Sequence, residues 1–349
     1  GITQIRTNNF LMDDLRPDEA LKQDFNYLDE HYGGVRPFEL SVIIKDTSMN
    51  VWDLEFLQTL ATVENYLENK YEVSIKNSLV RTLSIANRGA NGGDKDEFKL
   101  PPTQRKIRSY RRMIRMVDRG DFAKSFIDST ERNTRISGSI PDLGNIAVTK
   151  KNEALFKFLQ NKDMNGAIEY RLTGTANLID KNLKYLSVSL IKGLGVSILI
   201  VAFIIGLIYR SGTILIISII ANIIPLLFIA GFMGFFGIEL KTSTSIIFTI
   251  AFGIAVDDTI HFLGKFKHEL LKGKGKLYAL KRSYMTTGKA MILTTLILCS
   301  GFILLVFSSF LGTFYMGLLL SITLFVALIA DMTLLPALIL LFYKERKKN

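Results

Sequence analysis

Cysteine and histidine are scarce in this chain of 349 residues. The only cysteine, Cys299, lies inside an apolar stretch, so a disulfide framework is excluded. The three histidines (His31, His261 and His268) are too scattered in the sequence to form a metal site by spacing. The sequence also shows neither a nucleophile triad nor a phosphate-binding loop. We therefore expect a protein that is not an enzyme and that binds no metal and no cofactor.

Acidic residues are rare in the second half of the chain. Residues 187–349 hold 15 basic and 6 acidic side chains, whereas residues 1–186 hold 28 and 26. The net charge of +11 therefore belongs mainly to the second half, where Lys and Arg in short loops set membrane topology. This distribution gives no support for a nucleic-acid partner. No signal peptide is visible, so we expect targeting by the membrane segments or by sequence upstream of Gly1.

Long hydrophobic runs are the main feature of the second half, and the whole chain is 48% hydrophobic. Each run holds about 20 apolar residues, enough to cross the ~30 Å hydrocarbon core of a bilayer as a helix. The sequence thus predicts an α-helical membrane protein in which residues 187–349 form a five-helix transmembrane domain. The last helix is expected to kink or tilt because it carries Pro336. The predicted spans are residues 187–209, 213–236, 242–263, 289–310 and 313–343.

Basic residues are concentrated between and after two of these runs. Residues 265–289 carry eight basic side chains against one acid, Glu269, and the tail after Tyr343 reads KERKKN. Because basic loops stay in the cytoplasm, we expect a cytoplasmic C-terminus and residues 1–186 outside the cytoplasm. The protein is predicted to be a multi-pass protein of the plasma (inner) membrane. Residues 265–284 mix apolar side chains with lysines and are predicted to form a helix in the cytoplasmic interface, bound to membrane lipids.

The pattern of residues 1–186 predicts an α+β domain. Two β-α-β units, at 38–76 and 134–173, favour a split, ferredoxin-like (porter-like) sandwich. Residues 78–131 are predicted to be an insertion with helical flanks and a flexible tip at 87–96. A predicted arginine-rich helix at 104–120 is either solvated or a site for anionic lipid headgroups or an acidic partner, and the sequence leaves both open. Its arginines on one face are Arg108, Arg112, Arg115 and Arg119, with Arg111 beside them.

Two adjacent aspartates, Asp257 and Asp258, lie in the third predicted span. Carboxylates at membrane depth are costly and usually mark an ion or proton pathway. Two neighbouring carboxylates in a low-dielectric medium do not both ionise readily, which suits groups that take up and release protons. Asp257 shares a helical face with His261 and Gly253, whereas Asp258 points about 100° away. Helical geometry therefore favours Asp257 as the first proton carrier. The alternative is that the pair is protonated or hydrogen-bonded and only joins helices.

The strongest polar groups of three other spans lie at a similar depth. Counting about 1.5 Å per residue from the cytoplasmic ends, these groups and the aspartates lie roughly 10–18 Å deep. We expect Asp257, Asp258, Asp331 and His261 to form a proton relay, with hydrogen-bond partners in Asn222, Thr294 and Thr295. Two alternatives stay open: Asp331 satisfies backbone groups freed near Pro336, and His261 packs or reaches toward the interface.

The segment GIAVDD (residues 253–258) resembles the glycine-x-x-x-Asp-Asp motif of the resistance–nodulation–division (RND) superfamily. It is most similar to the MMPL-type predicted exporters and their sterol-sensing relatives, the Patched and Dispatched proteins. Asn222-x-x-Pro225, and Asp331 with Pro336, are also similar to that family. In many MMPL members, however, an Asp-Tyr pair stands where this chain has Asp257-Asp258.

The resemblance implies two repeats, each with one helix, an extracytoplasmic porter-like domain and five further helices. This chain is similar to the C-terminal half, so its expected partner is a missing N-terminal repeat or a second protomer. Gly253 and Pro225 are expected at helix-packing positions.

The leading hypothesis for function is a proton-motive-force-driven, secondary active exporter of lipidic or other hydrophobic compounds. Two alternatives remain. One is a protein-export accessory similar to SecD and SecF, and the other is a sterol-sensing-like module that binds lipid without turnover.

Overall fold

The computed structural model describes residues 8, 10–117, 125–164 and 166–344. The chain divides into two compact units. The sheet unit comprises Asn9–Met12 and Pro17–Asn182, and the helical unit comprises Gly1–Asn8, Asp13–Arg16 and Leu183–Asn349. The division after Asn182 lies four residues before the boundary predicted at 186/187.

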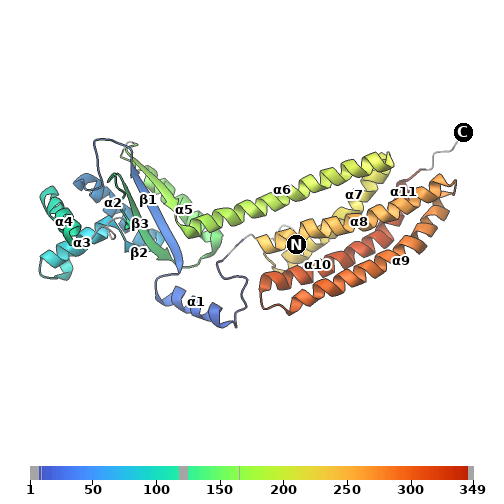
Figure 1. The fold of residues 1–349 in the computed structure, drawn as a ribbon, viewed down its shortest axis with the longest axis horizontal. Coiled ribbons are helices and arrows are strands. Elements are labelled where there is room, and N and C mark those ends of the chain that lie inside the picture. Colours follow the sequence, from blue (N-terminus) through green and yellow to red (C-terminus); the bar gives the residue numbers. More distant parts are fainter. Residues whose placement is uncertain (1–7, 9, 118–124, 165, 345–349) are drawn as a thin grey trace. The chain divides into compact units, whose positions relative to one another are not determined.

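The sheet unit contains a four-stranded antiparallel sheet with the order β2-β3-β1-β4 (Figure 1). Its central strand β1 alternates buried and more exposed residues, and the buried side chains of Phe38, Leu40, Val42 and Ile44 share one face. Burying each such side chain stabilises the fold by about 1.5–3 kcal/mol. The strands are β1 (Arg36–Ile44), β2 (Ser74–Asn77), β3 (Asn133–Ile140) and β4 (Ile168–Thr173).

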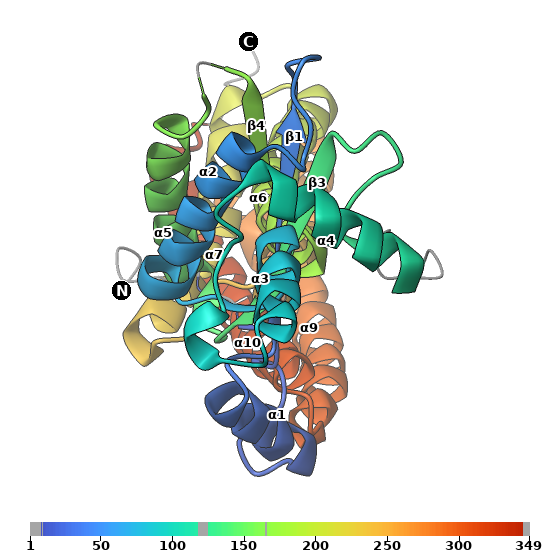
Figure 2. The same cartoon turned by 90° about the vertical axis from the view of Figure 1, so that its left-hand side faces the viewer.

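Two helices connect these strands pairwise and contribute to the same core. Helix α2 (Leu54–Tyr66) lies between β1 and β2 in sequence and continues into a π-helical turn, η2 (Leu67–Tyr71). Helix α5 (Gly144–Gln160) lies between β3 and β4, within the predicted unit at 134–173. Figure 2 shows α2 and α5 together with the strands of this unit. The sequence thus gives two β-α-β units on one sheet, with β1 paired to both β3 and β4.

The insertion between β2 and β3 is helical, with α3 (Leu79–Ala90), a short turn η3 (Lys95–Glu97) and α4 (Gln104–Val117). On α4, Ile107 and Tyr110 enter the core of the sheet unit. Arg111 and Arg115 both pair with Glu131, so part of the arginine face is neutralised within the unit. Arg108 and Arg112 are exposed, and Arg119 lies outside the described residues. A further helix, α1 (Ala20–His31), precedes β1.

The helical unit is built from helices long and apolar enough to cross a membrane, and five such spans occur in the described residues. Helix α6 begins in the sheet unit, earlier than the predicted start at residue 187. The last span consists of α10, a π-helical turn η6 and α11. The elements are α6 (Thr175–Tyr209), α7 (Gly212–Phe236), α8 (Thr242–Leu271), α9 (Lys276–Ile303) with η5 (Leu304–Phe307), α10 (Leu311–Ile329), η6 (Ala330–Leu334) and α11 (Leu335–Phe342).

The structure differs from the prediction of one interfacial helix over residues 265–284. Residues up to Leu271 continue α8, and α9 begins at Lys276, so the segment forms two helix ends joined by a turn. Gly273 has a φ of +77° in this turn, a conformation that suits glycine. Phe266 and Leu280 pack into a buried cluster of the helical unit instead of facing a membrane surface. Burial of these apolar side chains against neighbouring helices explains the difference.

Candidate functional site

Three buried polar side chains from three elements form a hydrogen-bonded chain inside the helical unit. Asn222 on α7, Thr259 on α8 and Asp331 on η6 are each no more than 2% exposed. The Thr259 hydroxyl lies 2.8 Å from Asp331 Oδ1 and 3.3 Å from Asn222 Oδ1. Asn222 Nδ2 donates to Thr259 Oγ1 at 3.1 Å and to the carbonyl of Ser218 at 2.8 Å. We name Asn222, Thr259 and Asp331 the polar triad.

The backbone is irregular at Asp331 and close to Asn222. Asp331 lies in the π-helical turn η6, and single π turns inside α-helices are frequent at functional sites. Pro225 follows Asn222 by less than one helical turn inside α7 and is itself buried. Because proline has no N–H, the carbonyl of Ala221 loses its helical partner. Asp331 bonds to Thr259 on another helix, which is a tertiary contact and different from the predicted alternative of a local backbone partner.

Asp258 lies between the polar triad and the helix α9. It is half-buried, and its carboxylate interacts with the side chain of Thr295 on α9. It is also close enough to Asp331 for the two charges to interact. Thr295 is 4% exposed. The hydrogen bonds of the triad join α7, α8 and η6, and Asp258 and Thr295 bring α9 into the same polar region. The roles predicted for these residues in a proton relay stay predictions.

Asp257 occupies a different position from Asp258. Its side chain is 72% exposed on α8 and lies 3.4 Å from Nε2 of His261, which is 68% exposed. Both residues line a cavity of about 740 Å³ between α8 and α9. Asp258 lines the same cavity and also interacts electrostatically with Asp331 of the buried triad. The other lining residues are Ile254, Lys265, Thr286, Thr287, Ala290, Met291, Thr294, Ile297 and Leu298.

Two predicted residues take other positions than expected. Thr294 lines the cavity, but its hydroxyl bonds to the carbonyls of Ala290 and Met291 in its own helix. Thr295 points inward because it follows Thr294 by one residue, about 100° around the helix. Gly253 does not pack closely within the described part of the chain, since a Cβ added there meets no atom within 4 Å. Gly253, Asp257 and His261 instead form one exposed face of α8, which we name the α8 face.

Thr259, the centre of the polar triad, was not predicted as a site residue. Its sequence signal is its place on the buried stripe of α8, where it follows Phe252, Ala255 and Val256 at helical spacing. A polar residue on an otherwise apolar buried stripe needs a hydrogen-bond partner. That partner, Asp331, is 72 residues away in sequence, so spacing alone does not identify it.

Comparison with known proteins places these residues in a family. The model of the MMPL family matches residues 142–348, which include all residues of the polar triad and the cavity. A relative, an apo-petrobactin exporter of Bacillus anthracis, is 25% identical over 231 residues. The matched region covers 62% of this chain and 30% of that relative, so the chain spans much less than the whole length of the relative.

Proposed function

The chain belongs to the MMPL family, and we propose that it forms part of a membrane exporter driven by the proton motive force. The observation that carries this proposal is the polar triad, in which a buried carboxyl group is joined by a hydroxyl group to two neighbouring helices. Asp258 joins this triad to the cavity that Asp257 and His261 line. Intramembrane carboxyl groups of this kind are typical of proton relays.

The Thr259 hydroxyl can act as a two-position switch in this mechanism. With Asp331 ionised, Thr259 donates its hydrogen to Asp331 Oδ1, at the observed distance of 2.8 Å. When Asp331 takes up a proton, the carboxylic acid donates to Thr259 Oγ1, and the hydroxyl hydrogen is free to turn toward Asn222 Oδ1. Protonation therefore reverses the direction of the Thr259–Asp331 hydrogen bond and adds a bond from the Thr259 hydroxyl to Asn222. Both contacts are buried, so this change strengthens the α7–α8 contact while the α8–η6 contact is kept.

Three carboxyl groups would carry the proton in sequence. Asp257, paired with His261, meets water in the cavity and exchanges protons with it. Asp258 passes the proton between the cavity, which it lines, and Asp331, with which it interacts electrostatically. In this proposal Asp258 replaces Asp257 as the residue next to the buried site, whereas Asp257 serves the entrance.

The distribution of basic side chains supports a cytoplasmic location for one end of the helical unit. Lys267 donates to the carbonyl of Ile208 near the end of α6, at 2.7 Å. Lys276 donates at 3.0 Å to the carbonyls of Leu340 and Tyr343 near the end of α11. These lysines cap the C-terminal ends of helices, which carry a partial negative charge. We propose that this end faces the cytoplasm of a cell with the protein in its plasma (inner) membrane, and that the sheet unit lies outside.

The strand order supports the proposal that the sheet unit is a ferredoxin-like, porter-like domain. Its two β-α-β units pair as β2-β3-β1-β4 with antiparallel neighbours, the arrangement expected of a split β-α-β sandwich. The α8 face suits a partner, because it combines charged groups at membrane depth with a glycine that leaves room for close approach. We propose that a second repeat or a second protomer covers this face.

Export of a lipidic or other hydrophobic compound is the proposed activity, and the relative named as an apo-petrobactin exporter supports the export direction. The test uses cells that express the full-length gene, loaded with a lipophilic fluorescent dye or with apo-petrobactin. Export should stop when a protonophore collapses the gradient, and Asp331→Asn and Asp258→Asn should abolish it. Thr294→Val is the matched control and should export normally, since its hydroxyl bonds only within α9.

Three results would contradict this proposal. Export of a probe by the Asp331→Asn variant at the wild-type rate would show that export does not depend on a proton relay through Asp331. Accumulation of unprocessed secretory precursors on depletion, with no change in export, would instead favour a SecD/SecF-like role. Lipid binding that ignores the proton gradient would favour a lipid-binding module without turnover.

A further inference from the structure

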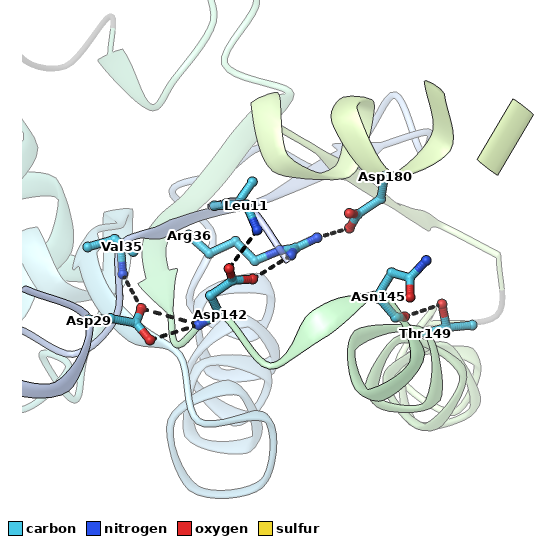
Figure 3. A network of polar contacts seen from close by, with 8 residues as sticks. All are labelled: Leu11, Asp29, Val35, Arg36, Asp142, Asn145, Thr149 and Asp180. Carbon is cyan, nitrogen blue, oxygen red and sulfur yellow. Dashed lines mark hydrogen bonds and ion pairs between the residues drawn. The ribbon is translucent and has the colours of Figure 1, made fainter. Parts of the chain in front are cut away.

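The sheet unit contains a buried arginine held between two carboxylates (Figure 3). Arg36, at the start of β1, has a side chain that is only 1% exposed. Its Nη1 donates to Asp142 Oδ1 at 3.0 Å, and its Nη2 donates to Asp180 Oδ2. A buried guanidinium is costly unless it is paired and hydrogen-bonded, so this position depends on its two partners.

The partner Asp142 is fixed by the rest of the sheet unit. Its side chain is 5% exposed, and its Oδ2 also accepts the backbone N–H of Leu11 at 2.7 Å. The N–H of Asp142 donates to the carboxylate of Asp29, at 3.1 and 3.2 Å to its two oxygens. Asp29 Oδ1 also accepts the N–H of Val35 at 3.0 Å. Arg36 and Asp142 are thus tied to two further segments of the unit, one at Leu11 and the other at Asp29 on α1.

The turn before β1 explains why Arg36 points toward Asp142. Gly34 has a φ of +92°, and a Cβ added there would lie 2.0 Å from the carbonyl carbon of Ile140. Only glycine lets the chain pass this close to the end of β3. In the β1–β3 register Arg36 pairs with Ile140, two residues before Asp142. The contact between Arg36 and Asp142 is therefore set by the backbone.

The second partner, Asp180, is held less tightly. Its side chain is 20% exposed and it lies in the first turns of α6. These turns also contact the sheet through Asn177, whose Nδ2 donates to the carbonyl of Leu172 at 2.8 Å. A cavity of about 20 Å³ borders both Arg36 and Asp180, enough for about one water molecule. Water can therefore replace Asp180 as a partner of the guanidinium.

We propose that the Arg36–Asp180 pair is a releasable latch that makes the sheet unit follow movements of α6, while Arg36–Asp142 stays closed. The latch rests on the proposed function, because α6 continues into the helical unit as its first membrane-spanning helix. Arg36 and Asp180 are positioning residues in this scheme. Without Asp180 the guanidinium still has one carboxylate partner, and the remaining Arg36–Asp142 pair is neutral. Without Asp142, by contrast, the contacts that hold several segments together are lost.

The first test measures amide hydrogen exchange of the full chain in lipid vesicles. For Asp180→Asn we expect about tenfold faster exchange in residues 175–182, with the sheet ends at 36–38 and 139–143 unchanged. Asp142→Asn should accelerate exchange at those sheet ends as well. Lys181→Gln, an exposed neighbour on α6, is the matched control and should resemble wild type. Asp180→Glu should restore slow exchange, since a longer carboxylate still reaches Arg36. Wild-type exchange in Asp180→Asn would overturn the latch.

The second test asks whether the latch transmits a change from the polar triad. Asp331→Asn imitates the protonated carboxyl group and should alter exchange at residues 139–143. In the double variant Asp331→Asn/Asp180→Asn this change should disappear. If both backgrounds show the same change, coupling bypasses Asp180 and the latch is wrong, although the proposed function survives. If neither background changes, no signal from Asp331 reaches the sheet unit and the latch is wrong, whereas the export measured for Asp331→Asn decides the proposed function separately.

Discussion

Thr259 is the residue on which the polar triad depends, because its one hydroxyl group serves both Asp331 and Asn222. Among the described contacts, Asn222 and Asp331 do not hydrogen-bond to each other directly. The Thr259 oxygen therefore provides the hydrogen-bonded link between the side chains of α7 and η6. A single hydroxyl with one hydrogen can satisfy only one acceptor at a time. The position of that hydrogen therefore reports the protonation state of Asp331.

Replacement of Thr259 by valine should abolish proton-coupled export while the protein still reaches the membrane. Valine keeps the shape but leaves Asp331 and Asn222 without their shared partner, a cost of about 1–3 kcal/mol for each unsatisfied buried group. We expect export of the dye to fall at least about tenfold, whereas Thr259→Ser, which keeps the hydroxyl, retains most of it. Normal export by Thr259→Val, measured in the same cells, would exclude the switch.

A second buried acid, Glu64, lies in the sheet unit and makes the stability of that unit depend on pH. Glu64 is 8% exposed on α2, near Ser78, the N-cap residue of α3. Burial raises the pKa of Glu64 to about 7, and the nearby Glu68 adds to this effect. The folded state then holds a proton that the unfolded state releases above about pH 4.5. Stability should therefore fall as the pH rises from about 4.5 to about 7.

The variant Glu64→Gln should lose this pH dependence. Its gain in the free energy of unfolding over wild type at about pH 8 should be on the order of 3 kcal/mol at most, with little gain at about pH 4.5. Trp52 is the only tryptophan in the chain and lies in the sheet-unit core, so its fluorescence reports unfolding of this unit. Glu55→Gln, at an exposed position on the same helix, is the control. Parallel pH profiles for wild type and Glu64→Gln would contradict this expectation.

At the scale of elements, two β-α-β units and five membrane-spanning helices could be predicted from local pattern alone. The alternation of apolar residues along β1 and the runs of about 20 apolar residues are local sequence signals that need no tertiary information. The contacts that matter most are not local. Thr259 and Asp331 are 72 residues apart, and Arg36 and Asp180 are 144 apart. The π turn at Asp331 also depends on packing, and so does the division of residues 265–284 between the end of α8 and the start of α9. Neither is encoded in the local sequence pattern.

The turn that enters β1 offers a test of one element. Gly34→Ala should prevent correct folding of the sheet unit, because the new Cβ would meet the backbone of Ile140. Gly93 has a similar φ of +85° but open space around it, so Gly93→Ala carries the backbone strain without the clash. We expect a loss of more than about 3 kcal/mol for Gly34→Ala and about 1 kcal/mol for Gly93→Ala. Equal losses, measured by Trp52 fluorescence in denaturant, would contradict the close approach.

At the scale of the whole molecule, the proposal that a second repeat or a second protomer covers the α8 face accounts for the charged groups exposed there. Asp257 and His261 are mostly exposed at a depth where lipid is a poor environment for charge. The chain also matches only 30% of the length of its relative. A second repeat or protomer on this face would shield the charges and close the cavity.

Assembly can be tested on this face with a bulky substitution. Gly253→Trp should weaken the assembly of the full-length protein, measured by its mass in detergent or nanodiscs, and should reduce export. Gly193→Trp is the control, because Gly193 on α6 also has open space around it. If the two variants assemble equally well, the α8 face is not the contact.

The central claim, that Asp331 and Asp258 carry protons for export, is tested most directly by proton movement in vesicles that contain the full-length protein. A pH-sensitive dye inside the vesicles records protons that move when an exported probe is added outside. The account predicts probe-driven proton movement for wild type and Thr294→Val, and none for Asp331→Asn or Asp258→Asn. Probe-driven proton movement by Asp331→Asn at the wild-type rate would contradict it.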